Sequence, residues 1–144
     1  MSTALLATRP PVPLSLYSDL DPQADEIRLL LLSPAPCTVP TVSCELLTVS
    51  LKDRPIYDAL SYVWGDPKIT RPIRVNGQVA QVTVNLEAAL RRIQQPDYQV
   101  RVWVDAVCVN QRDESERSSQ VAFMKEIYSN ARMVYAWLGE EGER

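Results

Sequence analysis

Short apolar runs, separated by turn-forming residues, dominate the first half of the chain. The continuous run EIRLLLL at 26–32 is typical of a strand that is covered on both faces. The segments VSCELLTVSL (42–51) and YDALSYVW (57–64) predict two further strands. The last of them ends at the turn formers GDP, residues 65–67. The first half therefore predicts three strands.

A hairpin and a helix are expected next. The Asn76-Gly77 dipeptide lies between two β-rich arms and predicts a two-residue turn, because both central positions favour positive φ. Asn85 is placed to cap a helix that ends before Pro96. The apolar residues of this helix recur at helical spacing and predict a stripe that faces a sheet: Leu86, Ala89, Leu90 and Ile93.

The second half alternates strand and helix patterns. VRVWVDAV (100–107) predicts a strand with Asp105 near its carboxyl end, and RMVYAWLG (132–139) predicts another. Between them, Asp113 and Glu116 resemble a capping box that opens a helix. One side of that helix is expected to carry its apolar residues: Val121, Met124, Ile127, Tyr128 and Ala131. This order predicts an α/β layered fold with parallel strands and an inserted β-hairpin.

Length and charge limit the possible classes of protein. The 144 residues, 46% of them hydrophobic, suit one domain at 26–144, preceded by an irregular, proline-containing leader at 1–25. A net charge of −3 without a basic stripe argues against nucleic acid as a partner. No apolar run approaches the roughly 18 residues of a membrane span, and the N-terminus does not resemble a signal peptide. We therefore expect a cytoplasmic protein without a membrane span.

The absent residue types exclude several chemistries. There is no histidine, which removes the usual general base and the usual zinc ligand. Cys37, Cys44 and Cys108 are not spaced as a zinc site or a disulfide framework, so we expect reduced, mostly buried thiols and no metal. The four glycines form none of the common phosphate-binding patterns, which excludes ordinary P-loop NTPases and dinucleotide dehydrogenases.

Two polar segments follow predicted strands and are candidates for a ligand site. Ligands of open parallel sheets bind outside the carboxyl ends of the strands, where YVWGDP (62–67) and DAVCVNQRD (105–113) are expected. The amides of Asn110 and Gln111 could read a ribose or a base edge. The same residue types also cap helices and close turns, so a purely structural interpretation stays open. It applies equally to Glu116, which suits a helix cap as well as a general base.

Other candidate residues also have structural alternatives. Trp64, Trp103 and Trp137 each end or interrupt a strand, and core packing explains large aromatic residues there. Ser61 and Tyr62 have no visible base partner that would make either of them a nucleophile.

Three blocks together resemble the heterokaryon incompatibility (HET) domain of filamentous fungi. They are YDALSYVWGDP, VTVNLEAALRRI and VWVDAVCVNQRDESERSSQVAFMKEIYSNARMVYAWLG, in the family's order and spacing. The resemblance runs from Ile27 to the end of the chain and departs slightly at Val107 and Val109, where the family often has isoleucine. It implies the N-terminal part of a longer domain of self/non-self recognition, whose activation leads to growth arrest and programmed cell death.

The HET domain is in turn regarded as distantly similar to the TIR domain, which implies a flavodoxin-like, mainly parallel sheet. Catalytic TIR domains cleave NAD, so NAD is the candidate cofactor that the resemblance implies, although the residues themselves specify none. The implied nucleotide-facing residues come from two loops: Ser61, Tyr62, Trp64, Asp66, Asp105, Asn110 and Gln111. No residue is assigned as catalytic. The resemblance leaves two functions open: signalling by self-association or protein partners, or one part of an NAD-cleaving enzyme that a further C-terminal segment completes.

Overall fold

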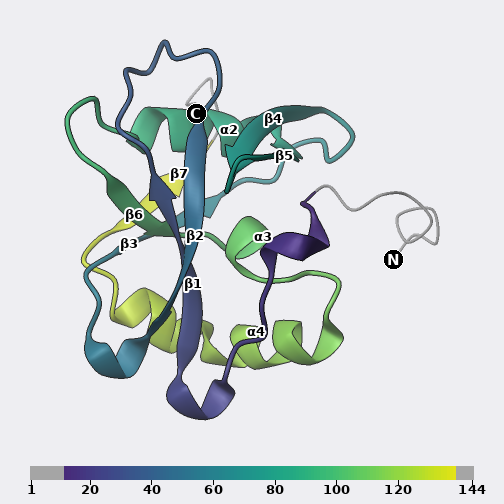
Figure 1. The fold of residues 1–144 in the computed structure, drawn as a ribbon, viewed down its shortest axis with the longest axis vertical. Coiled ribbons are helices and arrows are strands. Elements are labelled where there is room, and N and C mark those ends of the chain that lie inside the picture. The colour runs from purple at the N-terminus through teal and green to yellow at the C-terminus, as the bar shows by residue number, and fades with distance from the viewer. Residues whose placement is uncertain (1–11, 139–144) are drawn as a thin grey trace.

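The computed structural model describes residues 12–138, so residues 1–11 of the expected leader lie outside the described part. Within it, strands form one sheet in the order β5-β4-β2-β1-β6-β3-β7 (Figure 1). Their bounds are β1 (Glu26–Leu32), β2 (Ser43–Ser50), β3 (Asp58–Tyr62), β4 (Thr70–Val75), β5 (Gln78–Thr83), β6 (Val100–Trp103) and β7 (Val134–Trp137). The α/β class and the expected strands are confirmed.

The sheet is mixed, and the expectation of a mainly parallel sheet was wrong. β3 is parallel to both β6 and β7, and β2 is parallel to β4, but β1 runs antiparallel to both of its neighbours, β2 and β6. The β4–β5 pair is the predicted antiparallel hairpin, with Asn76 and Gly77 at φ 52° and 79° in its turn. Parallel pairing is confined to strands that are joined through helices or another strand, as crossover geometry requires.

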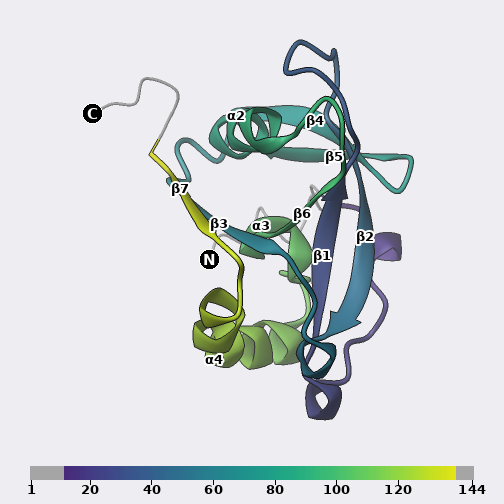
Figure 2. The same cartoon turned by 90° about the vertical axis from the view of Figure 1, so that its left-hand side faces the viewer.

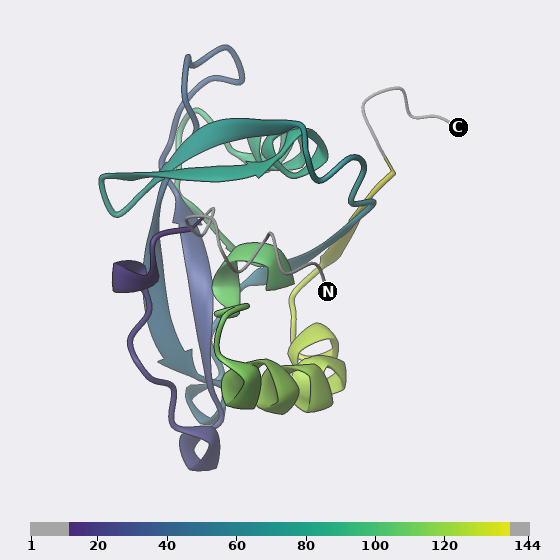
Figure 3. The ribbon, with the colours of Figure 1, turned by 90° about the vertical axis from the view of Figure 1, so that its right-hand side faces the viewer.

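The helices lie on both sides of the parallel strands. Their bounds are α2 (Val84–Ile93), α3 (Asp105–Cys108) and α4 (Glu114–Ser129). Figures 2 and 3 show α2 on one side of β3 and β7 and α4 on the other. Single 3-10 turns, η1 (Leu14–Leu16), η2 (Pro22–Ala24) and η3 (Leu51–Asp53), complete the described elements. The first of them brings Leu16 into the core.

The α2 helix forms where expected but is capped by a different residue. The Thr83 hydroxyl accepts a hydrogen bond from the Leu86 N–H at 3.3 Å, so Thr83 is the N-cap. Asn85 lies inside the helix, and its side chain donates to the carbonyl oxygen of Val63 instead. The predicted apolar stripe of α2 is buried, as expected.

The α4 helix also begins where predicted, because Asp113 accepts a hydrogen bond from the Glu116 N–H at 3.1 Å. The Glu116 carboxylate does not complete the predicted capping box, because it accepts from Arg28 and from the Asn110 N–H. Of the residues predicted for the buried side of α4, one is exposed. Val121 is 58% exposed, whereas Gln120 is buried and donates to the carbonyl of Glu26. A pattern based on apolar residues cannot predict a glutamine that is buried because it has a backbone hydrogen-bond partner.

The structure also bears on the cysteines and on the expectation of no membrane span. Cys37, Cys44 and Cys108 are free thiols, and the last two are buried. Among residues 12–138, no helix has the length and apolar character needed to cross a membrane.

Candidate functional site

The carboxyl ends of β3 and β6 lie side by side, and we call the residues that follow them the rim: 61–66 and 105–111. In the parallel pairing, Asp58 lies beside Val102 and Ala59 beside Trp103, so β3 continues past the last residue of β6. Helix α3 begins at Asp105, directly after Val104. The two polar segments are therefore neighbours.

Tyr62 and Asp105 couple the two segments electrostatically. The pKa of the Tyr62 hydroxyl is raised to about 12, chiefly by burial and secondly by the Asp105 carboxylate, while a hydrogen bond with Thr83 acts in the opposite direction. Burial also raises the pKa of Asp105 above its ordinary value, although the N–H groups of Ala106 and of Asp105 itself lower it. Tyr128 of α4 has a raised pKa because of burial and, secondly, the same carboxylate. A half-buried carboxylate with a perturbed pKa between tyrosines is a candidate for function.

The loop after β3 is exposed. The indole of Trp64 stacks on the Tyr62 ring, with centroids 6.3 Å apart and an angle of 10° between the planes. Trp64 is nevertheless 53% exposed, so the core-packing interpretation was wrong for this residue. Gly65 has φ +73°, and a Cβ there would lie 2.9 Å from the Asn85 side-chain nitrogen. Asp66 is exposed, and its carboxylate accepts from the Lys68 N–H at 2.9 Å.

The loop after α3 uses its amides on its own backbone. The Gln111 side chain donates to the carbonyl oxygens of Asp105, at 2.8 Å, and Val109, at 3.3 Å. The Asn110 side-chain oxygen accepts from the Arg112 N–H at 3.1 Å. Each of these amides thus has a structural partner, and each keeps polar atoms that these bonds do not use.

A buried ion pair beneath this loop was not found by sequence reasoning. Arg28 of β1 is 1% exposed and binds the Glu116 carboxylate through two nitrogens, at 2.6 and 2.8 Å. Arg28 also donates to the carbonyl oxygens of Cys108 and Ser18, and Glu116 accepts from the Asn110 N–H. The signal in the sequence was an arginine inside the apolar run EIRLLLL. Arg28 thereby ties β1, α3 and α4 together.

Two groups form among the predicted site residues, and Ser61 and Asp66 belong to neither. Tyr62, Trp64 and Asp105 lie together, as their stacking and electrostatic coupling show. Asn110 and Gln111 follow in the same loop as Asp105 and hold its backbone. Ser61 is exposed and, by strand alternation, points to the opposite face from Tyr62. Asp66 lies farther out in its turn.

Residues 12–138 contain no cluster of three or more cysteine or carboxylate side chains that could hold a metal ion. The two cavities of about 370 and 290 Å³ beside α2 are not lined by any of the seven predicted site residues. The rim is thus an open polar edge, with hydroxyl, carboxylate and indole groups available to a ligand.

Fold and rim together define an α/β protein whose polar edge lies at the carboxyl ends of adjacent parallel strands. Residues 57–144 match the family model "Heterokaryon incompatibility protein (HET)". The chain is also 37% identical, over 133 residues, to "Heterokaryon incompatibility protein 6, OR allele" of Neurospora crassa. That match covers 83% of this chain but only 20% of the relative, so the chain spans about a fifth of the relative's length. No solved structure matches the chain.

The chain belongs to the heterokaryon incompatibility family. This confirms the resemblance on which the site expectations depend.

Proposed function

We propose that this protein is a cytoplasmic signalling module of fungal self/non-self recognition that acts by assembly and leads to growth arrest and cell death. The observation that carries the proposal is family membership, together with the identity to a heterokaryon incompatibility protein over most of the chain. Expression of the chain in a filamentous fungus tests it, with growth rate and uptake of a vital dye as readouts. Normal growth at high expression would contradict it.

Assembly is the mechanism that this proposal assigns to the signal. Exposed apolar side chains at the end of the sheet, such as Met133, Val134 and Leu138, support it, because such patches mark interaction surfaces. Sedimentation velocity over a range of concentrations tests self-association. A single monomeric species throughout would exclude self-association and leave only assembly with a different protein.

The rim is proposed to bind a nucleotide such as NAD. Asp105 forms no ion pair with any described cation, so its carboxylate is available to accept from ribose hydroxyl groups. The exposed indole of Trp64 offers a surface on which a base can stack. The order β6-β3-β7, with β3 first in the chain, also resembles the switch point at which doubly wound sheets bind nucleotides.

Calorimetric titration with NAD tests this part of the proposal. Asp105→Ala and Trp64→Ala are expected to weaken binding about tenfold each, which corresponds to one lost contact of about 1.4 kcal/mol. Asp53→Ala is the matched control, because Asp53 is exposed in the single turn η3 and the change in charge is the same. Equal binding by all variants would place any nucleotide away from the rim.

A second candidate function is one part of a TIR-like enzyme that cleaves NAD and is completed by a further C-terminal segment. The parallel strands β6-β3-β7, with helices on both sides, are the observation that favours it. If a longer parent sequence exists, its incubation with NAD tests this function through released nicotinamide, with Asp105→Ala as the comparison. No release, even after forced oligomerisation, would leave assembly as the function.

A further inference from the structure

The strand β7 ends the sheet in the described part of the chain and has one unpaired edge (Figures 1 and 2). Ala59 N–H donates to the Met133 carbonyl and Val63 N–H to the Trp137 carbonyl, at 2.9 and 3.0 Å. Because backbone groups alternate along a strand, Val134 and Ala136 direct their N–H and C=O groups away from β3. Among residues 12–138, no strand pairs with these groups.

The exposed edge is apolar. The six residues of MVYAWL, 133–138, include no charged residue, proline or glycine. Leu138 is 69% exposed, and Met133 and Val134 are 44% and 48% exposed. Proteins usually protect such edges with charge, proline or a covering element, because an unprotected edge is a template for strand addition.

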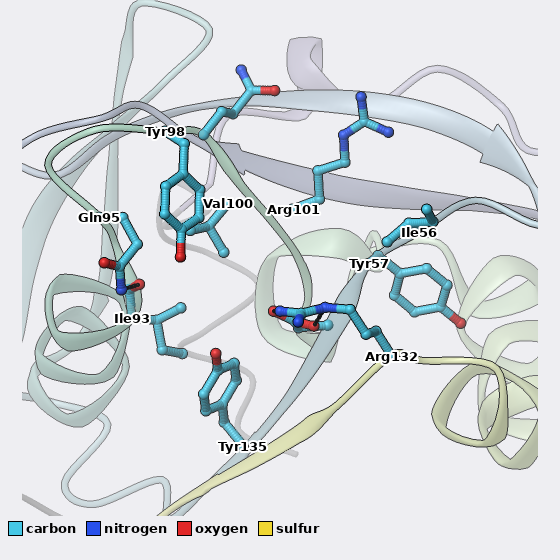
Figure 4. Close-up of a pocket in the computed structure, with 11 residues that line it drawn as sticks. Ile56, Tyr57, Ile93, Gln95, Tyr98, Val100, Arg101, Arg132 and Tyr135 are labelled. Carbon is cyan, nitrogen blue, oxygen red and sulfur yellow. Dashed lines mark hydrogen bonds and ion pairs between the residues drawn. The ribbon is translucent and has the colours of Figure 1, made fainter.

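Beside this edge, on the side of α2, lies a groove formed by two cavities of about 370 and 290 Å³. Both cavities are lined by Ile93, Gln95 and Tyr135, so they adjoin one another at β7. We call this the α2 groove. In Figure 4, the hydroxyl ends of Tyr98 and Tyr135 point toward one another across the opening. A strand added to β7 would direct every second side chain into this groove.

The charged residues of the groove favour an acidic occupant. Arg92 and Arg101 line it and form no ion pair among the described residues. Arg132 is paired with Asp58, at 3.0 and 2.9 Å, but its side chain remains 58% exposed. The positive charges therefore outnumber the single carboxylate of the lining.

We propose that β7 and the α2 groove bind an extended acidic peptide of a partner protein as an added strand. Main-chain hydrogen bonds to Val134 and Ala136 hold the peptide, and its carboxylates meet Arg92 and the exposed side chain of Arg132. A second copy of β7 fits less well, because residues 133–138 bring no carboxylate to the arginines. The inference rests on the assembly part of the proposed function and names its partner chemistry, but it does not depend on nucleotide at the rim.

Fluorescence anisotropy with a labelled peptide in which glutamate alternates with valine tests the proposal on the full chain. Saturable binding is expected for this peptide, and about tenfold weaker binding for one in which lysine replaces glutamate. Ala136→Pro removes an outward N–H and is expected to weaken binding at least about tenfold, whereas Ala136→Val, which keeps the N–H, binds as the original chain does.

A second pair of variants tests the charges, and it remains informative if Ala136→Pro does not fold. Arg92→Glu is expected to weaken binding about tenfold or more, while Arg74→Glu, an equal change of charge on the hairpin strand β4, has no effect. Equal binding of both peptides, or unchanged binding by Ala136→Pro and Arg92→Glu, would overturn the proposal. The proposal would also be overturned if the protein did not bind the peptide but formed dimers that Ala136→Pro abolishes. The occupant of the edge would then be a second copy of the chain.

The outcomes for this surface and for the proposed function can be told apart. Peptide binding without growth arrest in the fungal assay would refute the signalling function and leave the surface standing. Growth arrest that persists in Ala136→Pro and Arg92→Glu would support the signalling function and overturn this surface as its partner site.

Discussion

The loop that follows β6 and the loop that follows β3 lie at the same edge of the sheet, but the protein holds them in different ways. The first is fixed from below by the buried pair of Arg28 and Glu116, and Tyr17 donates to the carbonyl of Val107 at 2.7 Å. The second is exposed, and one side chain of α2, Asn85, binds its backbone at Val63. The rim thus combines a preorganised part, which carries Asp105, with a part that is open to solvent at Trp64.

This difference indicates how each loop would contribute to the free energy of ligand binding. A group that is already fixed costs little entropy when it binds, so Asp105 is suited to set the orientation of a ligand. An exposed loop loses freedom when it closes on a ligand, so Trp64 is suited to be the adjustable contact.

Removing one partner of the buried ion pair is expected to have the largest effect. Arg28→Met leaves the Glu116 carboxylate buried without its cation and should lower the free energy of unfolding by about 3–5 kcal/mol. Urea unfolding measures this loss. The double variant Arg28→Met, Glu116→Leu should recover part of it, because no charge is then left unpaired. If Arg28→Met unfolds at the original urea concentration, the loop after β6 is not held by this pair.

Gly65 is the point at which the exposed loop is most constrained. Gly65→Ala forces a side chain into a backbone with φ +73° and brings its Cβ to 2.9 Å from the Asn85 nitrogen. A loss of about 1–2 kcal/mol in the free energy of unfolding is expected from the left-handed conformation alone. Thermal or urea unfolding checks it.

The matched variant separates the two causes of this loss. Gly65→Ala combined with Asn85→Ala removes the close contact but keeps the backbone conformation and also removes the bond to Val63. If the double variant is more stable than Gly65→Ala, the contact dominates; if it is less stable, the bond from Asn85 to the loop dominates. A Gly65→Ala protein as stable as the original would show that the loop can relax freely.

Much of the fold follows from local patterns in the sequence. The run at 26–32, the Asn76-Gly77 turn and the stripe on α2 each depend on short-range physics, and each is found as predicted. The direction of β1 relative to β6 does not follow from such a pattern, because a strand shows the same alternation of apolar and polar residues in either direction. The prediction of a mainly parallel sheet was wrong for this reason.

The position of the candidate site could be predicted from the sequence, but the contacts that hold its loops in place could not. A polar segment after an apolar strand marks the carboxyl edge of a sheet, and the structure brings Tyr62 and Asp105 together there. Which residues hold that segment depends on contacts between distant parts of the chain. Arg28 and Glu116 are 88 positions apart in the sequence, so no local pattern links them.

Asp105 is expected to make stability depend on pH. Its pKa in the folded protein is raised by burial, so between the unfolded and the folded pKa the unfolded chain binds fewer protons, and stability falls as the pH rises through this range. Asp105→Asn should therefore be more stable than the original chain at neutral pH. The gap should narrow as the pH falls and close below the ordinary value of 3.8. Urea unfolding at several pH values measures it.

The control for this titration is Asp53→Asn, at an exposed carboxylate of the turn η3. It should show no comparable change of the gap with pH. A gap for Asp105→Asn that stays constant from acidic to neutral pH would mean that the carboxylate is as well solvated in the folded protein as in the unfolded chain.

The smallest effect is expected at the exposed tryptophan. Trp64 is 53% exposed and Trp103 is fully buried, so Trp64→Ala should change the free energy of unfolding by no more than about 0.5 kcal/mol, while Trp103→Ala should lower it by about 3–5 kcal/mol. Urea unfolding of the two variants gives the comparison directly. A loss above about 1 kcal/mol for Trp64→Ala would show that its stacking on Tyr62 supports the fold. A negligible loss would show that the indole ring contributes little to packing, as its exposure indicates.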